Sequence, residues 1–148
     1  MGLKHDPQLT HIAILNTTSG EVVFKPAESW KPPMSDRASI EFQTGPMVIQ
    51  ANVPDTQSIR QSINGLRSHQ RTLLGYTEED MLKFFITVRK PERLDKLGEY
   101  LLNVSIFEGK TLSVINLDGG PSVALDSQAH PELNHNRDAV LPILFALR

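Results

Sequence analysis

The sequence predicts an α+β fold, in which a mixed, mostly antiparallel β-sheet packs against one or two helices. Three observations support this prediction. Most apolar residues fall in short runs of strand length, turn-forming residues separate these runs, and one segment near residue 97 places its leucines at helical spacing. Successive strands joined by short turns pair antiparallel, so most of the sheet is expected to be antiparallel.

Paired strands are predicted in the first part of the chain. Two hairpins are expected, formed by residues 11–15 with 21–24 and by residues 71–76 with 81–88. Residues 38–42 and 47–49 are predicted to be short strands on either side of the bend Thr44-Gly45-Pro46. The segment 25–37 is expected to be an ordered loop or a short linker, and the segment 54–68 is expected to be a loop or a frayed helical turn.

The clearest helix is expected to open at Pro91. Leu94, Leu97 and Leu101 fall at helical spacing, and charged residues occupy the opposite face. Gly98 lowers the stability of such a helix by about 1 kcal/mol relative to alanine, which predicts close packing on a sheet at that point.

The last third of the chain is expected to return to extended structure. Residues 112–117 are predicted to be an interior strand, and Asp118-Gly119-Gly120-Pro121 is predicted to be a turn. Residues 122–125 should resume a strand, residues 126–138 a polar loop, and the apolar residues 139–147 a closing strand at an edge or a bulge, because of Pro142.

The composition is typical of one soluble globular domain spanning residues 1–148. A fold of this length buries roughly 68–70% of the surface of its unfolded chain, enough to stand without disulfides. The absence of cysteine excludes a thiol nucleophile and thiolate zinc sites. The formal net charge of −2, without a long run of one sign, argues against nucleic acid as a partner. No apolar run reaches the ~20 residues of a membrane helix, and the start resembles no signal peptide, so the cellular location stays open.

The most informative stretch is Asn116-Leu117-Asp118-Gly119-Gly120-Pro121-Ser122. A glycine-rich bend after an apolar strand puts a carboxylate and backbone N–H groups at the end of a sheet, where ligands commonly bind. Successive N–H groups can also form an anion-binding nest that suits phosphate. The alternative is an ordinary surface turn, because Asp-Gly is a common hairpin signal.

Arg71 and His69 are the other candidates, near the start of a predicted strand and on one face of it. An arginine there can bind phosphate through two hydrogen bonds, or it can pair with a carboxylate or lie in water. His69, His130 and His135 have no short ligand spacing, so no metal and no other cofactor is expected. Ser122 lacks the G-x-S-x-G context of a serine hydrolase.

Three separated segments together resemble one family, the phosphodiester glycosidase domain. They are Gln43-Thr44-Gly45-Pro46-Met47-Val48-Ile49, similar to its SGP strand, Arg71-Thr72-Leu73-Leu74-Gly75, similar to its RTxxG strand, and residues 116–122, similar to its NLDGGxS loop. Their order agrees, with a helix between the second and third, and the resemblance covers roughly residues 10–148. The family includes a lysosomal enzyme that uncovers mannose 6-phosphate, and bacterial envelope proteins.

The resemblance implies a hydrolase that breaks the bond between the anomeric carbon of a sugar and a phosphodiester oxygen. It implies Asp118 and Arg71 as catalytic residues, with Asp118 as base, nucleophile or sugar ligand. Substrate contacts would come from Asn116, Gly119, Gly120, Ser122, Gly45 and His69. Glu41 and Asp138 are candidates for a second carboxylate.

Two other functions stay open. Family members begin with an Asn-Gly-Gly-Phe-Phe-type segment, which this sequence lacks, so it resembles the C-terminal two-thirds of the domain. The chain is therefore expected to be a glycosidase, a non-catalytic module that binds phosphorylated glycans, or a fragment that needs an N-terminal segment or a partner. A homo-oligomer that supplies the absent strand is compatible with the last of these.

Overall fold

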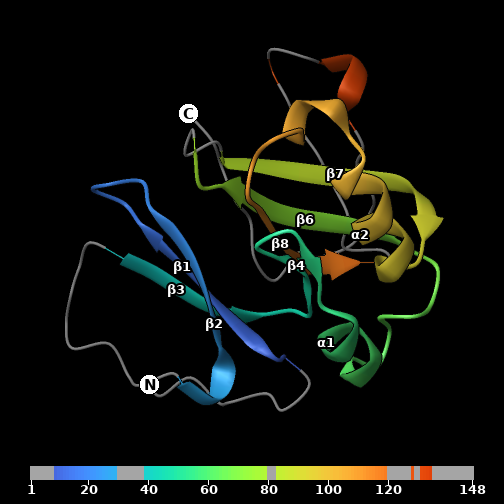
Figure 1. The fold of residues 1–148 in the computed structure, drawn as a ribbon, viewed down its shortest axis with the longest axis horizontal. Helices are drawn as coiled ribbons and strands as arrows, with labels where there is room; N and C mark the ends of the chain where they lie inside the picture. Colours follow the sequence, from blue (N-terminus) through green and yellow to red (C-terminus); the bar gives the residue numbers. More distant parts are fainter. Residues whose placement is uncertain (1–8, 30–38, 80–82, 120–127, 129–130, 135–148) are drawn as a thin grey trace.

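A computed structural model describes residues 9–29, 39–79, 83–119, 128 and 131–134, and within these ranges the chain forms two sheets (Figure 1). The first sheet has the order β2-β1-β3 and the second has the order β5-β4-β8-β6-β7. Their strands are β1 (His11–Asn16), β2 (Val22–Pro26), β3 (Ser39–Thr44), β4 (Met47–Gln50), β5 (Val53–Pro54), β6 (His69–Thr77), β7 (Lys83–Glu92) and β8 (Leu112–Gly119). The helices are α1 (Thr56–Gln61) and α2 (Leu94–Leu102), with short 3₁₀ helices at Ala27–Ser29, Ser105–Phe107 and Pro131–Leu133.

The α+β prediction is confirmed, and every described strand pairing is antiparallel. Both expected hairpins form, β1 with β2 and β6 with β7. In the first, the Asn16 side chain accepts hydrogen bonds from the N–H groups of Thr18 and Ser19 at 2.9 and 3.0 Å, and Gly20 has a φ of 69°. A short polar side chain and a glycine with positive φ close the turn, as the sequence predicts.

The strands on either side of Thr44-Gly45-Pro46 belong to different sheets. β3 pairs with β1, whereas β4 pairs with β5 and β8. The Gly45–Pro46 peptide bond is cis, and Gly45 has a φ of 128°. The predicted bend is therefore the place where the chain passes from one sheet to the other.

β8 is an interior strand, as predicted, because β4 and β6 lie on either side of it. The predicted turn at 118–121 is wrong in its first half, since Asp118 and Gly119 continue β8 and pair with Thr72 and Arg71 of β6. The register shifts between these pairs and the next one, Leu73 with Asn116. A bulge at this point lets β8 follow β6 to its first residues.

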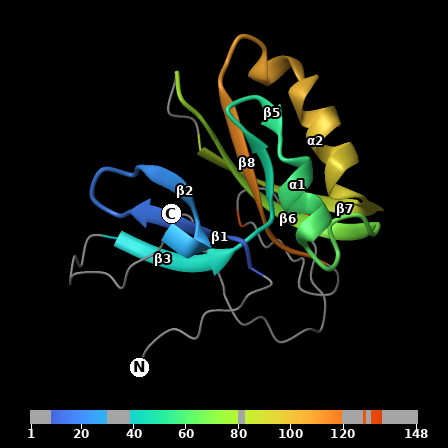
Figure 2. The ribbon, with the colours of Figure 1, turned by 60° about the horizontal axis from the view of Figure 1, so that its bottom comes forward.

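The core consists of two apolar clusters on opposite faces of the five-stranded sheet. One cluster packs Ile59 of α1 and Leu97 of α2 onto Leu73 and Val114. The other packs Ala13 of the three-stranded sheet onto the next residues of the same strands, Leu74 and Ile115. Successive residues of a strand point to opposite faces, so β6 and β8 are apolar on both sides. Figure 2 shows the two helices on one side of this sheet and the three-stranded sheet on the other.

The helix predicted after Pro91 begins later than expected, at Leu94. Pro91 and Glu92 end β7, and Arg93 stands at the N-cap position of α2. A Cβ atom at Gly98 would lie 3.3 Å from Val48 Cγ1, so this face of the helix packs closely on β4. α1 lies within the segment 54–68, where a loop or a frayed helical turn is expected, and it forms the helical alternative. The Asp55 side chain caps it by accepting the Ser58 N–H at 2.9 Å.

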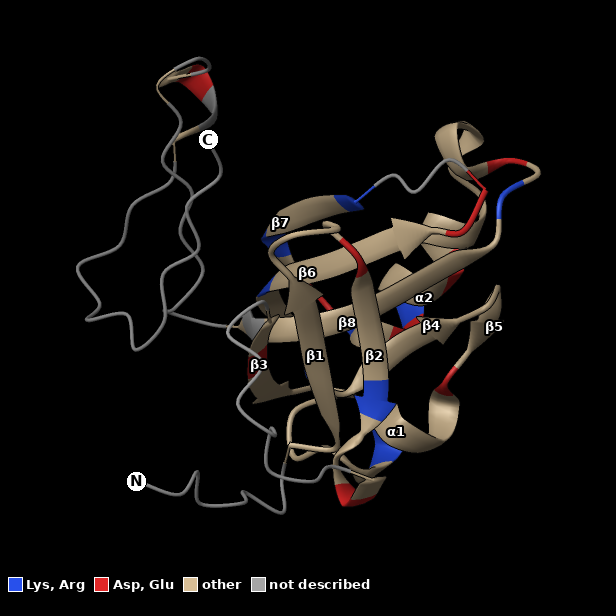
Figure 3. Ribbon diagram, turned by 90° about the vertical axis from the view of Figure 1, so that its left-hand side faces the viewer, with Lys and Arg blue, Asp and Glu red and all other residues tan. Residues whose placement is uncertain are grey.

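Other predictions fall on residues that the structure does not describe. They are the strands at 122–125 and 139–147, most of the loop 126–138 and the greater part of the segment 25–37. Within the described ranges, no helix has the length and apolar character needed to span a membrane. Acidic and basic residues are interspersed over the described elements in Figure 3, in keeping with the net charge of −2.

Candidate functional site

The three sequence motifs meet at one edge of the five-stranded sheet. β8 runs antiparallel to both β4 and β6, so the end of β8 lies beside the beginnings of its two neighbours. Met47 pairs with Ile115 on one side, and Arg71 pairs with Gly119 on the other. Three segments that are each more than 20 residues apart in sequence therefore form a common edge, which we call the motif edge: residues 44–47, 69–72 and 115–119.

Arg71 is buried at the motif edge, with 3% of its surface exposed. Its Nη2 donates hydrogen bonds to the backbone carbonyls of Asn64 and Arg67, at 2.6 and 2.9 Å. A Cβ atom at position 119 would lie 3.1 Å from Arg71 Nη1, so the guanidinium lies directly against Gly119. The structure thus brings together the arginine and the first glycine of the predicted anion site, and it also ties the arginine to the loop before β6.

Hydrogen bonds join Asn116 to the bend between the two sheets. The sequence does not predict this contact. Its backbone N–H donates to the Pro46 carbonyl at 3.0 Å, and its carbonyl accepts the Gly45 N–H at 3.1 Å and the Thr44 hydroxyl at 2.8 Å. Its side-chain Nδ2 donates to the Gly45 carbonyl at 3.2 Å. Asn116 is 5% exposed, and its buried Oδ1 has no hydrogen-bond partner among the described residues. These hydrogen bonds fix the orientation of Asn116 at the bend.

Gly45 is required by its surroundings. A Cβ atom at this position would lie 2.7 Å from the Thr10 hydroxyl oxygen and 3.3 Å from the Thr10 backbone nitrogen. Real Cβ atoms essentially never come as close to another atom as the first of these distances, and a φ of 128° is strained for any residue with a side chain. The glycine lets the start of β1 pack against the motif edge.

The remaining candidates are only partly described. Asp118 lies in β8 opposite Thr72, and the structure describes its backbone but not its side chain. Gly120 and Ser122 lie outside the described residues. His69 is the first residue of β6 and lies opposite Glu92 of β7. Its Nε2 is buried without a hydrogen-bond partner in the described part of the chain.

Glu41 and Asp138 are the two candidates for a second carboxylate beside Asp118. Glu41 lies in β3 opposite Ile14, whereas Asp138 is outside the described residues. Within the described ranges, no three His, Asp or Glu side chains gather as metal ligands would.

A polar pocket of about 400 Å³ next to the motif edge was missed by the sequence reasoning. It lies between the start of β1 and the start of α1, and His11 and Asp55 are among the residues that line it. Burial lowers the pKa of His11 below its ordinary value of 6.5, and the negative charge of Asp55 opposes this shift. The sequence held two signals, a histidine opening an apolar strand and an aspartate preceding a helix, but neither indicates that the two residues approach each other.

Comparison with known proteins finds similarity to solved structures only. No family model matches this sequence, and no curated protein matches it. Among solved structures, the chain is similar to the catalytic domain of zebrafish N-acetylglucosamine-1-phosphodiester alpha-N-acetylglucosaminidase, auto-inhibited by its pro-peptide, with a TM-score of 0.52 and 16% identity. The match covers 78% of this chain and 41% of that chain, so this sequence spans less than half the length of its structural relative. At this identity the likeness shows a shared fold, which agrees with the resemblance seen in the three motifs.

Proposed function

We propose that this chain is a glycosidase-type domain that acts on a sugar 1-phosphodiester at the motif edge. One observation carries the proposal: Arg71 and Gly119 are cross-strand neighbours, with the guanidinium against the glycine. The fold shared with a phosphodiester glycosidase supports it. A positive charge beside a glycine-rich segment suits a phosphate group, because the guanidinium and the backbone N–H groups can donate hydrogen bonds to the same anion.

The proposed reaction is a hydrolysis, in which the bond between the anomeric carbon and the phosphate oxygen breaks and the oxygen of a water molecule becomes bonded to that carbon in the product sugar. Its transition state carries positive charge on the sugar ring and growing negative charge on the departing phosphate. Phosphate leaves readily, so the site needs stabilisation of the anion more than a general acid. Arg71 would supply fixed positive charge, because its bonds to the Asn64 and Arg67 carbonyls hold it in place. Asp118 would act on the sugar side, as base, nucleophile or hydroxyl ligand.

The second candidate function is a module that binds phosphorylated glycans without cleaving them. It is favoured by the two hydrogen bonds that Arg71 donates to backbone carbonyls, because these bonds serve the fold as much as a ligand. A third candidate is a fragment that acts only with a further segment or a partner chain.

The test replaces Asp118 with asparagine. We expect Asp118→Asn to abolish release of N-acetylglucosamine from a 1-phosphodiester of that sugar while leaving the thermal midpoint nearly unchanged, because the two side chains are almost the same size. Glu99→Gln makes the same chemical change at an exposed position of α2 and should leave release intact. If the folded fraction of Asp118→Asn still releases sugar, Asp118 is not catalytic. If the wild-type chain binds the phosphodiester in calorimetry but never releases sugar, the binding module replaces the enzyme.

A further inference from the structure

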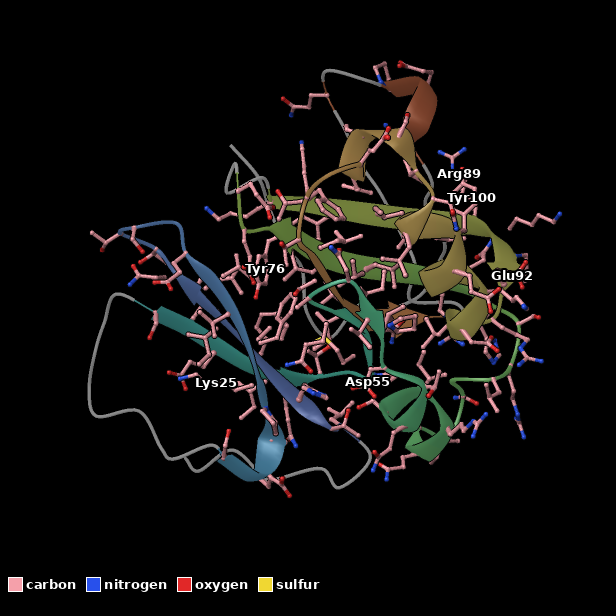
Figure 4. The ribbon with its side chains drawn as sticks, viewed as in Figure 1. Lys25, Asp55, Tyr76, Arg89, Glu92 and Tyr100 are labelled. Carbon is pink, nitrogen blue, oxygen red and sulfur yellow. The ribbon has the colours of Figure 1, made fainter. Side chains whose placement is uncertain are left out.

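The polar pocket adjoins the motif edge through Gly45, whose backbone lies against Thr10. Its volume of about 400 Å³ falls within the range of small-molecule sites, roughly 300–1,000 Å³. In Figure 4, Asp55 lies where α1 faces the lower end of the three-stranded sheet. The polar side chains that line the pocket include Thr10, His11, Glu28, Asp55, Gln57 and Gln61.

These side chains offer both donors and acceptors. The carboxamides of Gln57 and Gln61 and the hydroxyl of Thr10 can each donate and accept, as a sugar hydroxyl can. The lining includes two carboxylates, from Glu28 and Asp55, and none of the described residues that line it is Lys or Arg. Negative charge without a positive counterpart disfavours an anion in this pocket. The pocket therefore suits the uncharged part of a ligand rather than its phosphate.

Two groups inside the pocket are already oriented. His11 is 8% exposed, and its Nδ1 lies 2.9 Å from the Thr10 hydroxyl oxygen. Because burial lowers the pKa of His11, the imidazole is neutral at pH 7 and can accept as well as donate. Asp55 Oδ1 accepts the Ser58 N–H at 2.9 Å, and its second carboxylate oxygen remains an acceptor. Groups held in this way lose little freedom when a ligand binds.

The rest of the wall is apolar. Leu9, Pro26 and Ala27 line the pocket beside the polar groups. A pyranose ring has the same mixed character, with hydroxyl groups around its rim and C–H bonds on its faces. We propose that the polar pocket is a subsite that binds an uncharged sugar ring next to the motif edge. The choice of a sugar rests on the proposed function, whereas the polarity and charge of the pocket do not.

The test uses methyl α-D-glucopyranoside as the probe, followed by amide NMR on the ¹⁵N-labelled chain. We expect saturable shifts at the amides of Thr10, Gln57 and Ser58. Gln57→Ala should weaken binding about fivefold, the loss of one or two hydrogen bonds. Arg60→Ala changes an exposed residue of the same helix that does not line the pocket, and it should alter the dissociation constant less than about twofold.

Three results would overturn the subsite. They are the absence of saturable shifts at these amides, shifts that Gln57→Ala leaves unchanged, and preferential binding of methylammonium over the glucoside, which would indicate a cation site. The proposed function is tested separately. If sugar binds in the pocket but no form of the chain hydrolyses a phosphodiester, the subsite stands and the enzymatic function fails. If hydrolysis depends on Asp118 while the pocket amides do not respond, the subsite alone fails.

Discussion

At the scale of single residues, Arg71 shows how one side chain can serve the fold and a site together. Its guanidinium is buried, donates to two backbone carbonyls and lies against Gly119. A planar guanidinium can make several such bonds at once, which a lysine ammonium cannot do in the same geometry. A substitution at Arg71 is therefore expected to lower the stability of the fold, in addition to any effect on ligand binding.

We expect Arg71→Ala to lower the free energy of unfolding by about 2 kcal/mol or more, because the carbonyls of Asn64 and Arg67 lose a charged donor. Urea denaturation monitored by circular dichroism measures the change. Arg60→Ala, at an exposed position of α1, should change the free energy by no more than about 0.5 kcal/mol. Equal stabilities of the two variants would mean that the bonds of Arg71 contribute nothing to the fold.

His11 should make the stability depend on pH. Burial lowers its pKa in the folded state, so the unfolded state binds more protons as the pH falls. The stability that comes from neutral His11 is complete above the ordinary pKa of 6.5 and is lost as the pH falls from there toward the lower folded pKa. Urea titrations between about pH 7.5 and 5.5 should show this loss in the wild type and a flatter profile in His11→Gln. Parallel profiles would show that His11 does not titrate as its burial implies.

At the scale of elements, α2 was the most predictable part of the chain. The leucine spacing identified its buried face, and Leu94, Leu97 and Leu101 all lie in the core. Its first residue was less predictable, because β7 extends through Pro91 to Glu92. A proline at the end of an edge strand costs no ladder bond, so the sequence alone could not tell the end of a strand from the start of a helix.

The two faces of α2 should respond very differently to truncation. We expect Leu97→Ala to lower the free energy of unfolding by about 2–5 kcal/mol, because it removes buried methyl groups and leaves a cavity against the sheet. Tyr100→Ala, where the side chain is 68% exposed, should change it by about 0.5 kcal/mol or less. Chemical denaturation of both variants measures the difference. A large effect at Tyr100 would indicate that another surface covers this face.

At the scale of the whole molecule, the two sheets share a core. Ala13 and Val22 of the three-stranded sheet pack with Met47, Leu74 and Ile115 of the five-stranded sheet. Tyr76 lies between the sheets in Figure 4, with its ring centroid 5.3 Å from that of Phe24. Hydrophobic contact of this kind couples the stability of one sheet to that of the other.

We therefore expect the chain to unfold in one cooperative transition, as a single domain. The far-UV signal of the sheets and the near-UV signal of the aromatic side chains should change with the same midpoint in urea. Leu74→Ala, which removes contacts between the sheets, should lower both midpoints together. Two separate transitions in the wild type would mean that the sheets are independent units.

The sequence by itself determined the type of most elements and the place of the bends at residues 16–20 and 44–46, because apolar periodicity and turn residues act over a few neighbouring positions. It also indicated the motif residues Arg71, Asn116 and Gly119. Only the tertiary structure decided that the bend at Gly45 joins two sheets, that Arg71 bonds to the loop before β6, and that His11 and Asp55 line one pocket. These facts depend on pairing between segments far apart in the chain, which local pattern does not encode.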